Sequence, residues 1–130
     1  MTETIEITVR GFHLDAFNHV NNARFLEFME DARWAIFKAA LLKTQQLNCA
    51  MAIVNININY RHPALLYQRL RVGGDISKIG NKSFVMTQHI HCIETDQLVA
   101  DADLTCVIVD NQTGKAIPIN DEWQAVLQMR

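Results

Sequence analysis

Four polar residues that could take part in catalysis lie close together in the segment GFHLDAFNHVNNARFLEFMEDARW, residues 11–34. They are an acid, Asp15, an imidazole, His19, and two amides, Asn21 and Asn22. A carboxylate can attack a carbonyl carbon or take a proton from water, and an imidazole transfers protons near neutral pH. The residues after the amides are patterned as a helix, whose first N–H groups lack intrahelical partners and can hold an anion. The segment therefore combines a nucleophile or base with donors for a developing oxyanion.

Each of these residues also has a structural interpretation. Asp15 could be an ordinary turn acid or a helix cap, and asparagines are good caps because their side-chain oxygens accept hydrogen bonds from free N–H groups. His19 could act as a base or could hold the loop by a hydrogen bond, and we favour the second role. The residues alone leave these alternatives open, because turn acids and caps are common in segments of this kind.

One long amphipathic helix is predicted from Asn21 or Asn22 to about Leu42. Apolar side chains recur there at helical spacing, and the stripe that they form is wide. A helix this apolar is expected to lie against a sheet. The apolar positions on its buried side are Phe25, Met29, Ala32, Ile36 and Ala40.

Five strands are predicted around this helix, and the turns between them are rich in Gly, Asn and Asp. The strands cover residues 4–10, 52–60, 69–80, 83–93 and 98–110. A short extension at 116–119 and a terminal helix at 121–129 follow them. The order of one strand, one helix and four further strands predicts an α+β domain that spans residues 1–130, with the helix on one sheet face.

The second predicted strand, AIVNININY, has the clearest alternation in the chain. Val54, Ile56, Ile58 and Tyr60 are expected on one face, and asparagines occupy the other. Asparagines on a strand face can hydrogen-bond across an interface as well as to water. The second sheet face and at least one edge also need cover, so the pattern favours oligomerisation.

Composition excludes several classes of protein. A chain of 130 residues with a net charge of −2 has no bulk attraction for nucleic acid or anionic membranes. No apolar run resembles a signal peptide or a membrane span. The three cysteines include no C-x-x-C pair and are expected to be reduced in a cytoplasmic protein. His89 and His91 share a strand face, but no third ligand accompanies them, so we predict no metal site.

The motif residues resemble the hotdog-fold thioesterases of the 4-hydroxybenzoyl-CoA thioesterase family, and among these the bacterial long-chain acyl-CoA thioesterases. The family pattern is D-x-x-x-H-V-N-N, then an aromatic residue, then E-x-A-R. The matching residues here are Asp15, His19, Val20, Asn21, Asn22, Phe25, Glu30, Ala32 and Arg33. The segments VNININYRHPA and NKS also resemble family segments, in the same order.

The resemblance implies a hotdog fold, in which a five-stranded antiparallel sheet wraps around a long central helix. It implies a homodimer with a joined sheet, often paired again into a tetramer, with active sites at the dimer interface. It implies hydrolysis of acyl-CoA to free acid and CoA without a metal or cofactor. By position in the motif, Asp15 would be the nucleophile or general base and the Asn22 N–H the oxyanion donor, while Glu27 and Glu30 are weaker candidates.

Substrate-binding residues follow from the chemistry of CoA, whose phosphates attract Arg and Lys. The candidates are Asn21, Arg61, His62, Lys82 and Ser83, and for the basic residues ordinary surface charge is an equal alternative. A non-catalytic acyl-CoA-binding protein is the alternative function. A dehydratase of the same fold is disfavoured because its Pro-Gly-rich helix motif is absent.

Three positions depart from the family pattern. Phe12 and Phe25 stand where relatives often have tyrosine, so any hydroxyl that served catalysis there is missing. We interpret both as packing positions. Asn18 stands where many members have glycine, which can change the conformation of the loop that carries Asp15.

Overall fold

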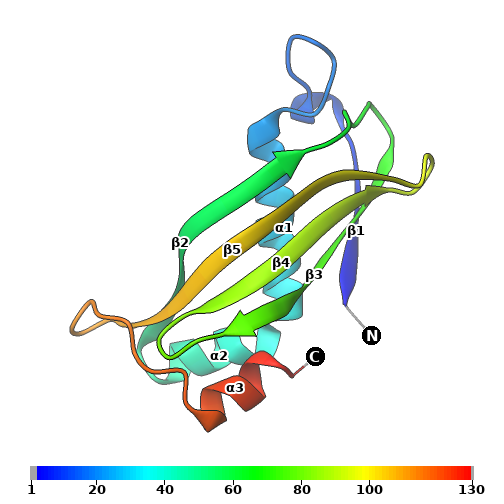
Figure 1. The fold of residues 1–130 in the computed structure, drawn as a ribbon. Coiled ribbons are helices and arrows are strands. Elements are labelled where there is room, and N and C mark those ends of the chain that lie inside the picture. Colours follow the sequence, from blue (N-terminus) through cyan, green and yellow to red (C-terminus); the bar gives the residue numbers. More distant parts are fainter. Residues whose placement is uncertain (1–2, 130) are drawn as a thin grey trace.

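The computed structural model describes residues 3–129 as one sheet, three α-helices and a short 3₁₀ turn (Figure 1). The strands are β1 (Thr4–Thr8), β2 (Cys49–Tyr60), β3 (Arg69–Ile79), β4 (Phe84–Cys92) and β5 (Gln97–Asp110). The helices are α1 (Asn22–Ile36), α2 (Lys38–Gln46) and α3 (Asp121–Leu127), and the 3₁₀ turn is η1 (Gly11–His13). Every predicted strand is present, with ends that differ by up to three residues. The predicted extension at 116–119 contains only one isolated bridge, from Ala116 to Val109.

All five strands are antiparallel and lie in the order β1-β3-β4-β5-β2. The predicted α+β fold with one five-stranded sheet and a long helix is therefore confirmed, and in Figure 1 α1 crosses one face of the sheet. The two edge strands differ in length, since β1 has 5 residues and β2 has 12. A long edge strand presents a row of unpaired N–H and C=O groups. No helix in residues 3–129 is long and apolar enough to cross a membrane.

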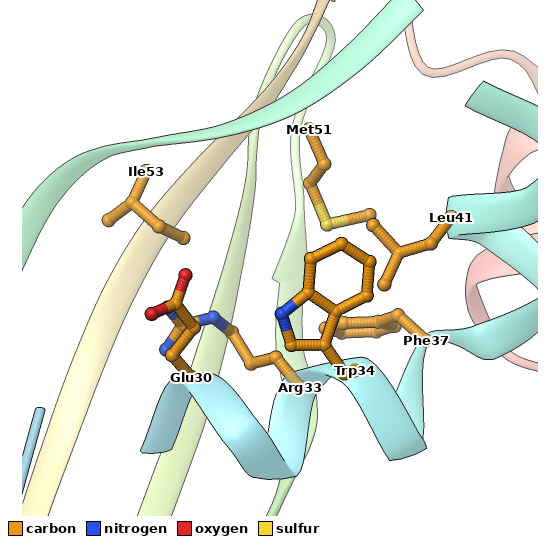
Figure 2. Close-up of a pocket in the computed structure, with 7 residues that line it drawn as sticks. All are labelled: Glu30, Arg33, Trp34, Phe37, Leu41, Met51 and Ile53. Atoms are coloured by element: carbon orange, nitrogen blue, oxygen red, sulfur yellow. The ribbon is translucent and has the colours of Figure 1, made fainter. Parts of the chain in front are cut away.

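The prediction of one continuous helix to Leu42 is wrong. The helix stops at Ile36, and Phe37 has φ −102° and ψ 27°, outside the helical range, before α2 begins. The ring of Phe37 is buried and packs edge-on against Phe84 of β4, with ring centroids 6.0 Å apart. Figure 2 shows Phe37 at this junction. After this bend α2 packs beside β2. The sequence around Phe37 contains no glycine or proline that would predict the bend.

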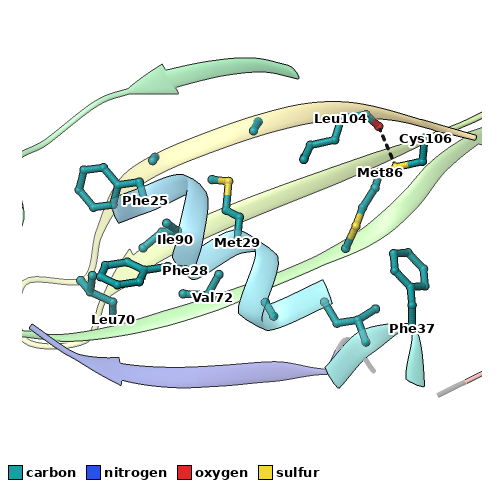
Figure 3. Close-up of a cluster of buried hydrophobic side chains, with 14 of the residues drawn as sticks. Phe25, Phe28, Met29, Phe37, Leu70, Val72, Met86, Ile90, Leu104 and Cys106 are labelled. Carbon is teal, nitrogen blue, oxygen red and sulfur yellow. Dashed lines mark hydrogen bonds between the residues drawn. The ribbon is translucent and has the colours of Figure 1, made fainter. Parts of the chain in front are cut away.

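The core lies between α1 and the inner face of the sheet (Figure 3). Alternate residues of β3, β4 and β5 point inward, as the two-residue period of a strand requires. Buried residues of α1 pack against β1, β3 and β4. The helix contributes Phe25, Phe28, Met29, Ala32 and Ile36, and the strands contribute Leu70, Val72, Met86, Ile90, Leu104 and Cys106.

One buried polar link fixes α1 on the sheet. Gln88 has no exposed surface, and its Nε2 donates to the carbonyl of Met29 at 3.0 Å. Its Oε1 accepts from the guanidinium of Arg33 at 3.0 Å. Gly74 on β3 makes room for this side chain, because a Cβ atom there would lie 2.7 Å from Gln88 Cγ. Both amide atoms of Gln88 are therefore satisfied by the helix.

The strand β2 begins three residues before its predicted start, and it contains a bulge between Ile53 and Asn55. From Asn55 onward the predicted alternation holds, and the asparagines face outward. Val54 lies in the bulge, so it does not continue the alternation as predicted. The register with β5 places Met51, Ile53, Ile56, Ile58 and Tyr60 opposite buried β5 residues, on the inner face.

Candidate active site

The loop that carries Asp15 is a small closed turn between η1 and α1. Leu14 and Val20 form a bridge at its base. Inside it the Asp15 N–H donates to the His19 carbonyl at 2.8 Å, and the Asn18 N–H donates to the Asp15 carbonyl at 3.1 Å. Asn18 has φ +60°, a left-handed conformation that asparagine tolerates better than most residues. This explains why asparagine can stand where many family members have glycine.

Only one oxygen of the Asp15 carboxylate is hydrogen-bonded within this turn. Its Oδ1 accepts from the N–H of Phe17 at 2.8 Å and from the N–H of His19 at 3.3 Å. Its Oδ2 has no hydrogen-bond partner among residues 3–129, and the side chain is half-buried. The loop therefore fixes the orientation of the carboxylate and leaves one oxygen available for a ligand or a water.

The start of α1 supplies the expected free donor. The side chain of Asn21 caps the helix by accepting from the Ala23 N–H at 2.9 Å, and the Arg24 N–H donates to the Asn21 carbonyl at 2.8 Å. Asn21 is therefore the cap residue, and Asn22 is the first residue of the helix. The Asn22 N–H has no acceptor in the part of the chain that the structure describes, as is usual for the first turn of a helix.

An open cleft of about 220 Å³ joins these groups. It brings together five of the eight predicted site residues, and it also includes Tyr60, which the sequence analysis placed only on one face of a strand. The cleft is lined by Asp15, His19, Val20, Asn22, Phe25, Tyr60, Arg61, His62 and Pro63. A carboxylate and a free N–H at a helix start thus border the same open space, which is the arrangement that acyl transfer requires.

Two of the lining residues are held at the rim by β5. Arg61 forms an ion pair with Asp101, which also accepts from the Asn59 amide at 3.1 Å. This hydrogen bond from the guanidinium lowers the pKa of Asp101 and raises that of Arg61. His62 contacts the Leu98 carbonyl through Nδ1 at 3.0 Å. Arg61 is therefore a fixed cation that remains about half-exposed.

Three predicted substrate-binding residues lie outside the cleft of this chain. Asn21 is exposed beside it and is occupied by its capping role. Lys82 and Ser83 lie in the β3–β4 turn, near the end of the sheet that carries α2 and α3 (Figure 1). The carbonyl of Asn81 in this turn accepts from the N–H of Ile119, in the segment before α3. Within one protomer these residues are far from the start of α1.

A second cavity, of about 110 Å³, lies at the other end of α1, where the helix faces β2 (Figure 2). Most of its wall is apolar, and Trp34 is 57% exposed at its edge. Burial lowers the pKa of Arg33, whose guanidinium points to Gln88. The lining residues are Glu30, Arg33, Trp34, Phe37, Leu41, Met51 and Ile53. Sequence analysis missed this cavity, because its walls come from separate elements.

The paired histidines lie on the outer face of the sheet. The His89 and His91 rings are 5.6 Å apart and pack edge-on. Across residues 3–129, no three His, Cys, Asp or Glu side chains are grouped so as to hold a metal ion. All three cysteines lie in the described range and are free. Neither these histidines nor the cysteines line the cleft.

Comparison with known proteins gives consistent matches. The model of the thioesterase-like superfamily matches residues 9–127. The long-chain acyl-CoA thioesterase FadM of Escherichia coli K12 is 41% identical over 125 residues, which cover 95% of each chain. The crystal structure of YbaW, a probable thioesterase from Escherichia coli, has a TM-score of 0.90 at 40% identity, with 96% of each chain covered.

A more distant structure shares the fold alone. It is SAV2348 of Staphylococcus aureus, solved in complex with CoA, which has a TM-score of 0.87 at 13% identity. The match covers 98% of this chain and 82% of that one.

Proposed function

The chain belongs to the thioesterase-like superfamily, and from this membership we propose that it is an acyl-CoA thioesterase that hydrolyses medium- or long-chain acyl-CoA to free fatty acid and CoA. Two observations outside the site support the proposal. A long-chain acyl-CoA thioesterase is 41% identical along nearly the whole chain. A protein of the same fold binds CoA.

The observation that carries the proposal is the shared cleft of Asp15 and Asn22. In the proposed reaction the free Oδ2 of Asp15 takes a proton from a water whose oxygen attacks the thioester carbon, or Oδ2 attacks that carbon itself. The electron pair of the carbonyl moves to its oxygen, which accepts from the Asn22 N–H. The C–S bond then breaks. If water has attacked, the CoA thiolate takes the proton from Asp15. If Asp15 has attacked, an acyl-Asp15 anhydride remains, a water hydrolyses it to the fatty acid, and the thiolate takes a proton of that water. One preorganised donor of this kind lowers such barriers by about 2.7–4 kcal/mol in other enzymes.

His19 supports this chemistry through its backbone. Its N–H donates to Asp15 Oδ1 at 3.3 Å and its carbonyl accepts from the Asp15 N–H at 2.8 Å. The imidazole is exposed and has no hydrogen-bond partner within residues 3–129. The residue is therefore proposed to shape the Asp15 loop, which is the structural role favoured from the sequence.

The preference for a longer acyl chain rests on the space between α1 and β2. Asn22 borders the cleft at one end of α1, and Trp34 borders the apolar cavity at the other. Twelve residues of helix separate them by roughly 18 Å. An extended alkyl chain advances about 1.3 Å per carbon, so roughly a dozen carbons or more reach from one to the other. Ile56, which is 41% exposed, faces the path between them.

The free edge of β2 supports a homodimer. This edge strand carries exposed apolar residues, among them Val54 at 59% and Tyr60 at 41%. Pairing with the β2 of a second copy would satisfy its unpaired backbone groups and extend the sheet. A partner protomer could then bring its own Lys82 and Ser83 toward the cleft. We propose that the CoA phosphates are held by Arg61 of one chain and the partner's Lys82, and that two such dimers form a tetramer.

A thiol-release assay tests the function. Purified protein is incubated with acyl-CoAs of 4, 8, 12 and 16 carbons, and free CoA is measured with a thiol reagent. We expect release in proportion to the enzyme concentration, with the highest kcat/KM for the two longer substrates. Binding of these substrates without release would instead indicate the non-catalytic acyl-CoA-binding protein, and would overturn the proposal.

A further inference from the structure

Tyr60 is placed in the cleft by its position as the last residue of β2. Its side chain lies on the inner face of the sheet, and its ring centroid is 5.8 Å from that of Phe25 on α1. Its hydroxyl donates to the carbonyl of Asn22 at 3.3 Å. The residue is 41% exposed and lines the same open space as Asp15. A phenol hydroxyl thus contacts Asn22, the residue whose N–H is free, and its ring lies next to that of Phe25, a position where relatives often have tyrosine.

The neighbours of Tyr60 hold it in this orientation. Asn59 and Arg61 lie on the opposite side of the strand, and both bind the carboxylate of Asp101. The backbone N–H of Arg61 also donates to the carbonyl of Val99 at 2.8 Å. Because the residues on both sides are fixed to β5, the ring of Tyr60 cannot turn to the outer face. The hydroxyl is therefore preorganised toward the start of α1, and preorganised donors are the ones that contribute most to catalysis.

The hydrogen bond that the hydroxyl makes here is weak and replaceable. Its length of 3.3 Å exceeds the usual range of about 2.5–3.0 Å for O–H···O bonds. Its acceptor, the Asn22 carbonyl, belongs to the first residue of α1 and is positioned to accept from an N–H about four residues further on. The helix does not need the phenol, so the hydroxyl can turn to a better acceptor without leaving a buried group unpaired.

A thioester oxygen would be such an acceptor. The nitrogen and the carbonyl oxygen of Asn22 are joined by three bonds and so lie within about 4 Å of each other. A hydroxyl that contacts this carbonyl is therefore close to the N–H of the same residue. An oxygen that accepts from two donors at about 2.9 Å each needs them to be no more than roughly 6 Å apart. The hydroxyl is 3.3 Å from that carbonyl, so it lies within roughly 7 Å of the Asn22 nitrogen, near this limit.

We propose that Tyr60 is a catalytic residue, whose hydroxyl donates a second hydrogen bond to the thioester oxygen beside the Asn22 N–H. The proposal rests on the thioesterase function argued above. As the attack moves the carbonyl electron pair to oxygen, that oxygen accepts from both donors, and Tyr60 keeps its proton throughout. The proton from the attacking water passes to Asp15 and then to the CoA thiolate when the C–S bond breaks.

The first test is Tyr60→Phe, which keeps the ring against Phe25 and removes only the hydroxyl. We expect kcat for dodecanoyl-CoA to fall by about tenfold to a hundredfold, with KM nearly unchanged, because the lost bond is strongest in the transition state. Tyr67→Phe is the matched control. It removes the hydroxyl of an exposed tyrosine that does not line the cleft, so its kcat should equal that of the unmodified protein.

The second test separates a donor from a mere tether between β2 and α1. Two non-hydrolysable dodecanoyl-CoA analogues are used as inhibitors: a ketone in which CH₂ replaces the thioester sulfur, and an S-dodecyl thioether that lacks the carbonyl. If Tyr60 donates to the carbonyl oxygen, Tyr60→Phe weakens binding of the ketone by about tenfold and leaves binding of the thioether unchanged. Equal weakening of both would indicate a structural tether and would overturn the proposal.

The outcomes also separate this inference from the proposed function. If the unmodified protein releases no CoA from any substrate, the thioesterase function fails. If it releases CoA, and Tyr60→Phe retains full kcat with unchanged inhibition by the ketone, only the role of Tyr60 is disproved.

Discussion

The two ends of α1 differ in the polarity and the size of the space beside them. At its start a free N–H, a carboxylate and a phenol border an open cleft of about 220 Å³. At its other end the helix breaks at Phe37, and a cavity of about 110 Å³ is lined mostly by aromatic and aliphatic side chains, together with Glu30 and Arg33. The same helix thus has one end suited to a developing negative charge and another suited to hydrocarbon.

The helix dipole explains why the two ends cannot exchange roles. The start of a helix carries a partial positive charge that stabilises an oxyanion, whereas its end carries a partial negative charge. Free carbonyls at the end would oppose the charge that thioester cleavage develops. Changes near the start should therefore act on the rate of the reaction, and changes near the end should act on the choice of substrate.

The largest expected effect comes from Asp15→Asn. The amide keeps the size of the side chain and an oxygen for the N–H of Phe17 and His19, but it cannot take a proton or attack. We expect kcat to fall by a factor of about 10²–10⁴, the range typical of a general base. Steady-state kinetics with dodecanoyl-CoA measures it, and circular dichroism checks the fold. Normal turnover in a folded variant would remove Asp15 from the mechanism.

Trp34→Ala tests the other end and should have a smaller effect. The indole borders the apolar cavity and is 57% exposed, so its loss should leave the fold intact while lengthening the available space. One methylene in an apolar pocket is worth about 1–3 kcal/mol, so we expect the ratio of kcat/KM for 16 over 12 carbons to rise by roughly tenfold. A fall of both values by the same factor would show that this cavity does not bind the end of the chain.

The end of α1 whose residues lie close together in the sequence could be predicted, and the end built from distant segments could not. Asp15, His19 and Asn22 lie within eight residues of one another, so a turn followed by a helix brings them together without tertiary information. Tyr60 reaches the cleft only through the register of β2 with β5, and alternation alone placed it on a strand face without linking it to the site. The apolar cavity combines α1, α2 and β2, and no spacing in the sequence encodes that meeting.

The errors in the fold have the same cause. Residues near Phe37 have ordinary helical patterning, so the break becomes visible only once the ring is seen against Phe84. The bulge at Val54 likewise leaves the alternation of NININY, residues 55–60, intact and shifts only the residues before it. Local preferences predicted that these elements exist, whereas contacts between distant residues decided where they bend.

Asn21→Ala tests whether the cap contributes to the order at the start of α1. Losing the bond to the Ala23 N–H should lower the free energy of unfolding by about 1 kcal/mol, measured by urea denaturation. Asn120→Ala is a matched control, since Asn120 caps α3 by accepting from the Trp123 N–H at 3.0 Å, far from the cleft. We expect both to lose similar stability, but only Asn21→Ala to lower kcat as well. Equal kcat in both variants would show that the N–H of Asn22 needs no support from the cap.

The smallest effect is expected from Lys82→Glu, which tests whether the β3–β4 turn of a partner protomer completes the cleft. An exposed charge contributes about 0.2–1 kcal/mol to an ion pair, so KM for acyl-CoA should rise about twofold to fivefold while kcat stays constant. Because salt screens exposed charges, the difference should shrink when the ionic strength is raised from 0.05 to 0.5 M, roughly. Lys38→Glu, an equal charge change on α2, should leave KM unchanged. If the two variants behave alike, the phosphates of CoA are held elsewhere, and the fixed cation of Arg61 remains the candidate within the cleft.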